Sequence, residues 1–87
     1  MNNATSLAAL IDRATKCAAA NTGAAMHSSA LVCLDDAREL AADGDSISAA
    51  RRALKAIAYS AGIFHADYRS ALASYDAWYL SAKGGSR

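Results

Sequence analysis

The chain has 87 residues, no proline and a formal net charge of +1. This length limits it to one domain with a small core, and the near-neutral charge gives no strong field to attract nucleic acid or an acidic substrate. Alanine is abundant and loses little entropy in a helix, so we expect an all-α fold. We predict one helical domain over 1–83, with helices at about 6–20, 24–42 and 46–82, and a flexible tail over 84–87.

The first predicted helix begins where Thr5 or Ser6 can cap it, because a hydroxyl there accepts a hydrogen bond from the free N–H groups of the first turn. Its apolar stripe is out of phase with the stripe of the second helix, so one straight helix cannot turn both inward. Asn21 and Gly23 suit a helix end, which predicts a break at 21–23. The run Asp-Gly-Asp-Ser at 43–46 predicts a second break.

The helix predicted over 46–82 carries the most regular pattern in the chain. Apolar side chains recur every seven residues in two series three residues apart, which is typical of a helix that packs along other helices. We refer to these residues as the seam: Ile47, Ala50, Leu54, Ile57, Ala61, Phe64, Tyr68, Ala71, Tyr75, Trp78 and Ala82. Gly62 lies on the outer face of this pattern, where it should weaken the helix by about 1 kcal/mol without ending it.

The short turn at 43–46 makes the second and third helices antiparallel neighbours. Two places remain open for the first helix. It packs against the aromatic second half of the long helix, or it folds back beside the second helix and leaves the end of the long helix projecting. In both cases an alanine-rich helix covers only part of the aromatic side chains. A homodimer, or another protein partner, is therefore expected to complete the bundle.

Large side chains off the seam or beside it predict a surface for protein partners. Five large apolar residues fall outside the seam: Tyr59, Ile63, Leu31, Val32 and Leu80. Several exposed apolar residues along one helical protein suggest a face used for association. Tyrosine, tryptophan and arginine are enriched where binding energy concentrates. The predicted interaction surface comprises Tyr59, Ile63, Tyr68, Arg69, Tyr75, Trp78 and Tyr79.

The only basic cluster is Arg51, Arg52 and Lys55, near the start of the predicted long helix. Cations are unfavourable at a helix N-terminus, so something should compensate them. Ion pairs across the hairpin are one interpretation, because four acidic residues stand on its other side: Asp35, Asp36, Glu39 and Asp43. The alternative is a set of phosphate contacts in a nucleic-acid-binding module, although nucleic acid is not the favoured partner.

No pattern points to catalysis, a metal or a cofactor. His27 and His65 come near each other when the chain is folded at the hairpin turn, but a metal would need a third ligand, and structural or solvated histidines are the preferred interpretation. Two cysteines, Cys17 and Cys33, form no metal-binding spacing. The acidic run lacks the spacing of a calcium loop, and the serines have no recognisable catalytic partners. No small-molecule substrate is evident.

The N-terminal sequence has no signal-peptide pattern, and no run reaches the roughly 18 apolar residues of a membrane span. We therefore expect a cytoplasmic protein, and the alanine content fits a high-GC bacterium or its phage. The favoured function is a non-enzymatic interaction protein, namely an adaptor, an inhibitor or an assembly subunit. The alternative is nucleic-acid binding through the basic cluster.

Overall fold

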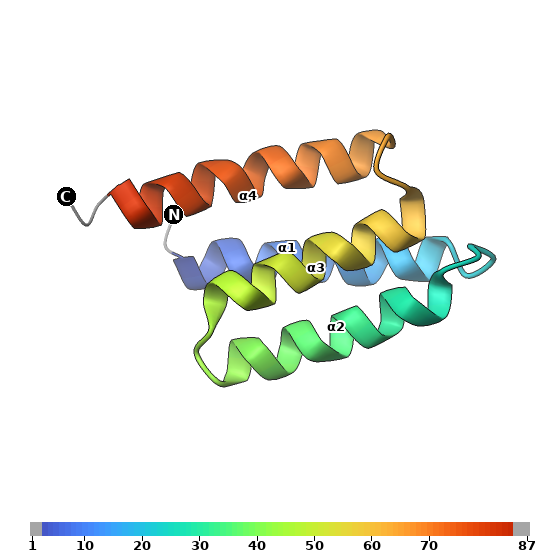
Figure 1. Ribbon diagram of the computed structural model, residues 1–87, viewed down its shortest axis with the longest axis horizontal. Helices are drawn as coiled ribbons and strands as arrows, with labels where there is room; N and C mark the ends of the chain where they lie inside the picture. Colours follow the sequence, from blue (N-terminus) through green and yellow to red (C-terminus); the bar gives the residue numbers. More distant parts are fainter. Residues whose placement is uncertain (1–2, 85–87) are drawn as a thin grey trace.

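The computed structural model describes the backbone of residues 3–84 and the side chains of residues 7–77 and Tyr79. These residues form four helices joined by short connections (Figure 1): α1 Asn3–Ala20, α2 His27–Ala42, α3 Ser46–Ala61 and α4 Ala66–Gly84. The all-α class predicted from alanine content is confirmed. Of the predicted tail, Gly84 is the last residue of α4, and 85–87 lie outside the described residues.

The break between α1 and α2 lies where the sequence predicted it, but it is longer. The side-chain amide of Asn21 donates to the Cys17 carbonyl over 2.8 Å and closes the end of α1. The chain then makes two successive turns. In the first the Ala24 N–H donates to the Asn21 carbonyl, and in the second the His27 N–H donates to the Ala24 carbonyl. Because of these turns α2 begins at His27 and not at residue 24.

At the start of the chain, α1 begins at Asn3. Thr5 and Ser6 are therefore inside the helix, and the cap predicted for one of them is wrong. The turn between α2 and α3 follows the prediction closely. Gly44 has a φ of 87°, a conformation that favours glycine, and the Asp45 carboxylate caps α3 by accepting a hydrogen bond from the Ser48 N–H over 3.2 Å.

The single long helix predicted over 46–82 is wrong, because the chain turns back between α3 and α4. Gly62 ends α3 with a φ of 96° and donates its N–H to the Ala58 carbonyl over 2.9 Å. His65 precedes α4, and its Nδ1 accepts a hydrogen bond from the Asp67 N–H over 3.1 Å. Folding back lets α4 cover α3 and α1 within one chain. That burial outweighs the loss of helical backbone over four residues.

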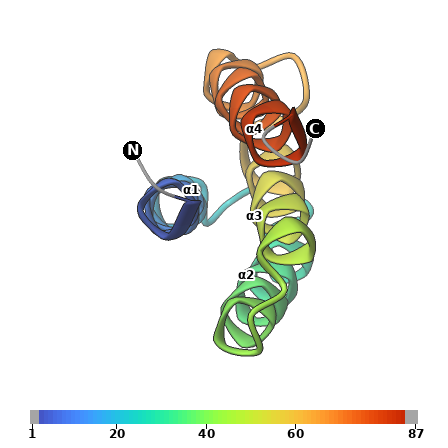
Figure 2. The same cartoon turned by 90° about the vertical axis from the view of Figure 1, so that its left-hand side faces the viewer.

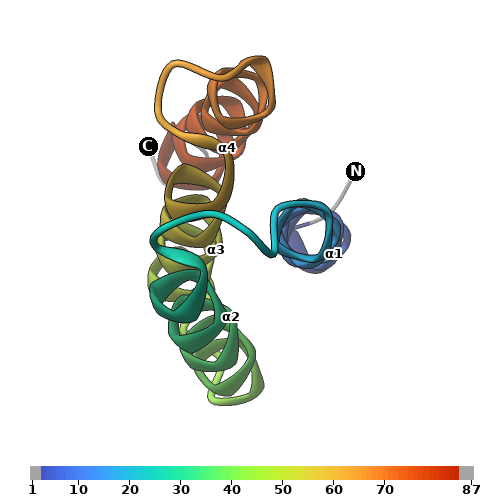
Figure 3. The ribbon, with the colours of Figure 1, turned by 90° about the vertical axis from the view of Figure 1, so that its right-hand side faces the viewer.

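Three of the helices form a layer, and the fourth lies along one face of that layer. Figure 2 and Figure 3 show α2, α3 and α4 side by side, with α1 packed on one face of that layer. The molecule measures 44 × 26 × 15 Å. Its centre is α3, because each of the other helices makes its most extensive contact with α3, and α2 and α4 do not contact each other within the described residues. The first helix occupies neither predicted place alone, since α1 packs mainly on α3 and makes smaller contacts with both α2 and α4.

Small side chains dominate the core. Ile57 is its largest fully buried residue, and alanines on all four helices lie around it, which allows the helices to approach closely. Seam residues on both sides of the break are buried, including Leu54, Ala71 and Tyr75. Ile47, Ala61 and Tyr68 are half-buried. Phe64 is the exposed one among the described seam residues, because it lies in the turn, and its exposed fraction is 86%. The side chains of Trp78 and Ala82 lie outside the described residues.

Candidate protein-interaction surface

The predicted interaction surface is divided by the turn between α3 and α4. Tyr75 is buried against the other helices, and three more tyrosines pack half-buried against the core: Tyr59, Tyr68 and Tyr79. Ile63 and Arg69 are exposed. The side chain of Trp78 lies outside the described residues. The described tyrosines of this surface thus face largely inward in one chain, and Tyr75 in particular is not available to a partner.

Tyr75 is the polar link between α3 and α4. The Arg51 Nε donates a hydrogen bond to the Tyr75 hydroxyl over 3.2 Å, and the Tyr75 ring stacks on Tyr79 with centroids 5.8 Å apart. This hydrogen bond is the main reason that the pKa of Arg51 lies above its ordinary value, with smaller contributions from the charges of Tyr75, Tyr79 and Asp45. This hydrogen bond joins a side chain of α3 to a side chain of α4.

The basic cluster lies on the outer side of α3. Because α1, α2 and α4 all contact α3, the exposed side chains of Arg51, Arg52 and Lys55 lie on the side that remains open. The ion pairs predicted across the hairpin are absent from the described residues, since no carboxylate oxygen there comes within 4.0 Å of these cations. Asp35 instead pairs with Arg38 on its own helix at 3.5 Å.

The two histidines do not form a metal site in the part of the chain that is described. No group of three metal-binding side chains occurs there. The Nδ1 of His65 lies 3.7 Å from the Asp67 carboxylate. The Nδ1 of His27 is buried without a hydrogen-bond partner among the described atoms. Cys17 and Cys33 are free and buried, and burial, followed by the charge of Asp67, raises the pKa of the Cys17 thiol.

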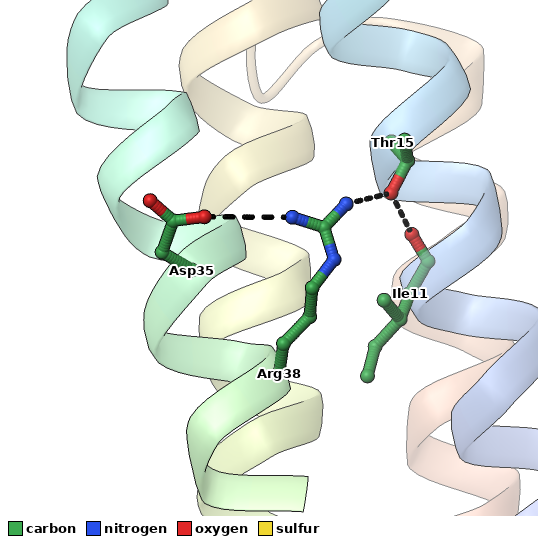
Figure 4. A network of polar contacts seen from close by, with 4 residues as sticks. All are labelled: Ile11, Thr15, Asp35 and Arg38. Atoms are coloured by element: carbon green, nitrogen blue, oxygen red, sulfur yellow. Dashed lines mark hydrogen bonds and ion pairs between the residues drawn. The ribbon is translucent and has the colours of Figure 1, made fainter.

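A surface groove of about 620 Å³ runs beside α1, where it faces the end of α2 and the start of α3. Figure 4 shows the polar network at its edge: Arg38 donates to the Thr15 hydroxyl over 3.0 Å, and that hydroxyl donates to the Ile11 carbonyl over 2.8 Å. Arg38 thereby ties α2 to α1. The groove is lined by Leu7, Ala8, Ile11, Asp12, Thr15, Arg38, Ala41 and Ser46.

The large exposed apolar side chains of the described residues gather toward one end of the molecule. Figure 1 shows the α1–α2 and α3–α4 connections at the same end, where α2 also begins. Met26 is in the first connection, Ile63 and Phe64 are in the second, and two more residues lie in the early turns of α2. We refer to these five as the apolar end: Met26, Leu31, Val32, Ile63 and Phe64.

Sequence reasoning identified three of these five residues as exposed, namely Leu31, Val32 and Ile63. It missed Phe64, because this residue fits the seam, and it missed Met26, because that residue falls inside the helix predicted over 24–42. The available signal was glycine, because Met26 and Phe64 both lie in connections that contain one. Gly23, with Asn21 before it, marks the connection that holds Met26, and Gly62 marks the connection that holds Phe64.

No family model, curated protein or solved structure matches this chain. None of the described helices has an apolar stretch long enough to cross a membrane.

Proposed function

We propose that this protein acts by binding another protein through the apolar end, without catalysing a reaction. The observation that carries the proposal is the placement of the large exposed apolar side chains, which lie toward one end of an elongated molecule. Single exposed apolar residues are ordinary, whereas a group of large ones in one region is typical of an interaction site. An adaptor, an inhibitor and an assembly subunit, each in the cytoplasm, fit this proposal.

Phe64 and Val32 have the largest exposed fractions in the apolar end, 86% and 60%. Enclosing an apolar side chain of this kind in an interface is worth about 1.5–3 kcal/mol. Two or three such side chains supply the concentrated binding energy that protein interfaces use, while their neighbours exclude water. Neither residue is needed for the core, so a binding role explains their exposure without a cost to the fold.

The experiment is a capture from native cell extract with two immobilised variants beside the parent chain. Leu31→Ser with Val32→Ser removes apolar surface from α2, and Ala42→Ser, at the opposite end of the same helix, is the matched control because Ala42 is also exposed. A partner retained by the parent and the control but lost from the double variant is expected. A partner retained equally by all three chains, or turnover of a small molecule by the purified chain, would contradict the proposal.

A homodimer through the aromatic half of the seam stays a prediction, but its basis is weaker. It assumed that Tyr75 and its neighbours lack cover within one chain, and Tyr75 packs against α3. The surface that a second copy would cover is correspondingly smaller. Sedimentation at micromolar concentration measures the mass directly, and loss of self-association in a chain with both Tyr75→Ala and Trp78→Ala would support this dimer.

The second candidate is nucleic-acid binding by Arg51, Arg52 and Lys55. The observation that favours it is that these three cations are exposed on the open side of α3 without carboxylate partners among the described residues. Phosphate contacts release counterions, so affinity must fall as salt rises. Binding to duplex DNA or RNA at ~50 mM salt that is lost when all three become alanine would support this candidate. Affinity that is unchanged by those substitutions would remove it.

A further inference from the structure

The seam stays in phase across a turn at which the helix is interrupted. Leu54 and Ile57 before the turn, and Ala71 and Tyr75 after it, occupy the same two heptad positions, and all four are buried. A chain that needs only two short antiparallel helices has no reason to keep one heptad register through the connection between them. The register instead suits a second state in which α3 and α4 form one continuous helix.

The connection leaves large apolar side chains uncovered in the folded-back state, although glycine suits the backbone conformation at residue 62. Gly62 has a φ of 96°, which side-chain-bearing residues rarely adopt. The two residues that follow, Ile63 and Phe64, are 55% and 86% exposed although both are large and apolar. Phe64 is also a seam residue. In a continuous helix it would turn to the same side as Ile57 and Ala71 and face whatever covers them.

The contact between α3 and α4 within one chain indicates what would cover these residues in a continuous helix. Arg51 lies opposite Tyr75, and the position midway between them is Ile63. If α4 of one copy lies on α3 of a second copy with the same contacts, two long antiparallel helices cross at residue 63 of each chain. The two turns then meet at a two-fold axis, and Phe64 of each copy is covered by the other.

We propose that 62–65 is a hinge at which α3 and α4 join into one helix, so that two copies of this chain exchange α4. The second copy is the occupant that the surface fits, because the faces of α1 and α3 that α4 vacates are complementary to α4 itself. Exchange of identical elements forms a dimer without requiring a new interface, apart from the hinge. This inference does not rest on the proposed function, since it involves no other protein.

The direct test is Gly62→Ala, compared with Gly44→Ala by sedimentation. A Cβ at either position meets open space, and both glycines have a positive φ, so each substitution strains its turn to a similar degree. Only at residue 62 does a continuous helix relieve the strain, because Asp45 caps a new helix after Gly44. Alanine favours helix over glycine by about fivefold per site, and a dimer has two hinges, so the association constant should rise at least about 25-fold. Gly44→Ala should stay monomeric.

A distance measurement separates exchange from ordinary association. Spin labels on Arg52→Cys and Asp76→Cys, both exposed positions, lie on neighbouring helices in the folded-back chain. Cys17→Ala and Cys33→Ala in the same chain keep the labels off the native thiols. Helices pack ~8–10 Å apart, so the labels stay within about 20 Å of each other. One continuous helix places them about 36 Å apart at ~1.5 Å per residue. Doubly labelled chains diluted in excess unlabelled chain report this intrachain distance, which should be the longer one in the Gly62→Ala dimer.

Phe64→Ser provides a second variant that does not depend on Gly62. The folded-back monomer leaves Phe64 exposed, so its thermal midpoint should not change, whereas a dimer that covers Phe64 twice should dissociate at least about tenfold more readily. The parent chain at millimolar concentration should therefore dimerise more than Phe64→Ser. A parent that stays monomeric there, with a Gly62→Ala chain that is monomeric or unfolded, would overturn the proposal. A dimer with the short intrachain distance would overturn it as well.

Discussion

Arg51 and Tyr75 are 24 residues apart in the sequence and are joined by a hydrogen bond of 3.2 Å from the guanidinium to the phenol. The contact exists only because the chain reverses between them. It links the start of α3 to the second half of α4, and the buried Tyr75 ring lies against the core at the same point. Tyr75 therefore attaches α4 both by a polar contact of its hydroxyl and by apolar contacts of its ring.

Replacing Tyr75 by alanine should destabilise the protein by about 3 kcal/mol, because it removes a buried ring and leaves a cavity beside α3. Tyr75→Phe keeps the ring and removes only the acceptor of the Arg51 hydrogen bond, so its effect should be much smaller. Urea unfolding followed by circular dichroism measures both. Equal losses for the two variants would show that the hydroxyl, and not the ring, attaches α4.

Ile57 should be the most sensitive aliphatic position of the chain. It is fully buried on the central helix, and truncation to alanine should cost about 2–5 kcal/mol through lost burial and the cavity left behind. Val32→Ala removes a comparable number of methyl groups from a side chain that is 60% exposed, and should change stability by less than about 0.5 kcal/mol. Similar unfolding midpoints for the two variants would contradict the placement of Ile57.

Asp45 caps α3 through its hydrogen bond to the Ser48 N–H. Asp45→Ala should lower stability by about 0.5–2 kcal/mol, since that N–H loses its acceptor. Asp45→Ser retains an oxygen that can accept the same bond and is the matched control. Thermal unfolding of the three chains tests this, and an alanine variant as stable as the parent would show that the cap is dispensable.

Local chemistry explains which parts of this fold were predictable. The Asp-Gly-Asp-Ser turn was predicted correctly because its residues have strong and separate preferences: Gly44 for a positive φ, and Asp45 for a cap. The end of α1 was predicted correctly because the apolar stripe changes phase there. Both signals are contained in a few neighbouring residues, so no knowledge of tertiary contacts was needed.

The turn at Gly62 could not be predicted in the same way. One glycine lowers helix stability by only about 1 kcal/mol, and the heptad register continues past it without a phase change. What decides the outcome is the burial of Ala71 and Tyr75 against α1 and α3, which is a property of the folded chain. The same error placed Phe64 on the buried seam, and it assigned Tyr75 to the surface for partners although the structure buries it.

Cys17 should make the protein less stable in alkaline solution. Burial raises the pKa of its thiol above the ordinary value of 9.0, so the folded state holds the proton more tightly than the unfolded state does. The resulting stabilisation is complete below the unfolded pKa and is lost as the pH rises through the folded one. Stability measured from pH 8 upward should therefore fall less steeply in Cys17→Ala than in the parent. Parallel curves would contradict this.

The reversal of the chain between α3 and α4 is the central claim, and solution NMR tests it most directly at a concentration where sedimentation gives the mass of one chain. The backbone shifts should be helical over Ser46–Ala61 and again from Ala66, and should lose helical character at 62–65. Proton contacts should join the Tyr75 ring to α3. Unbroken helical shifts from Ser46 to Ala82 in a monomer, without contacts between Tyr75 and α3, would contradict the fold described for this chain.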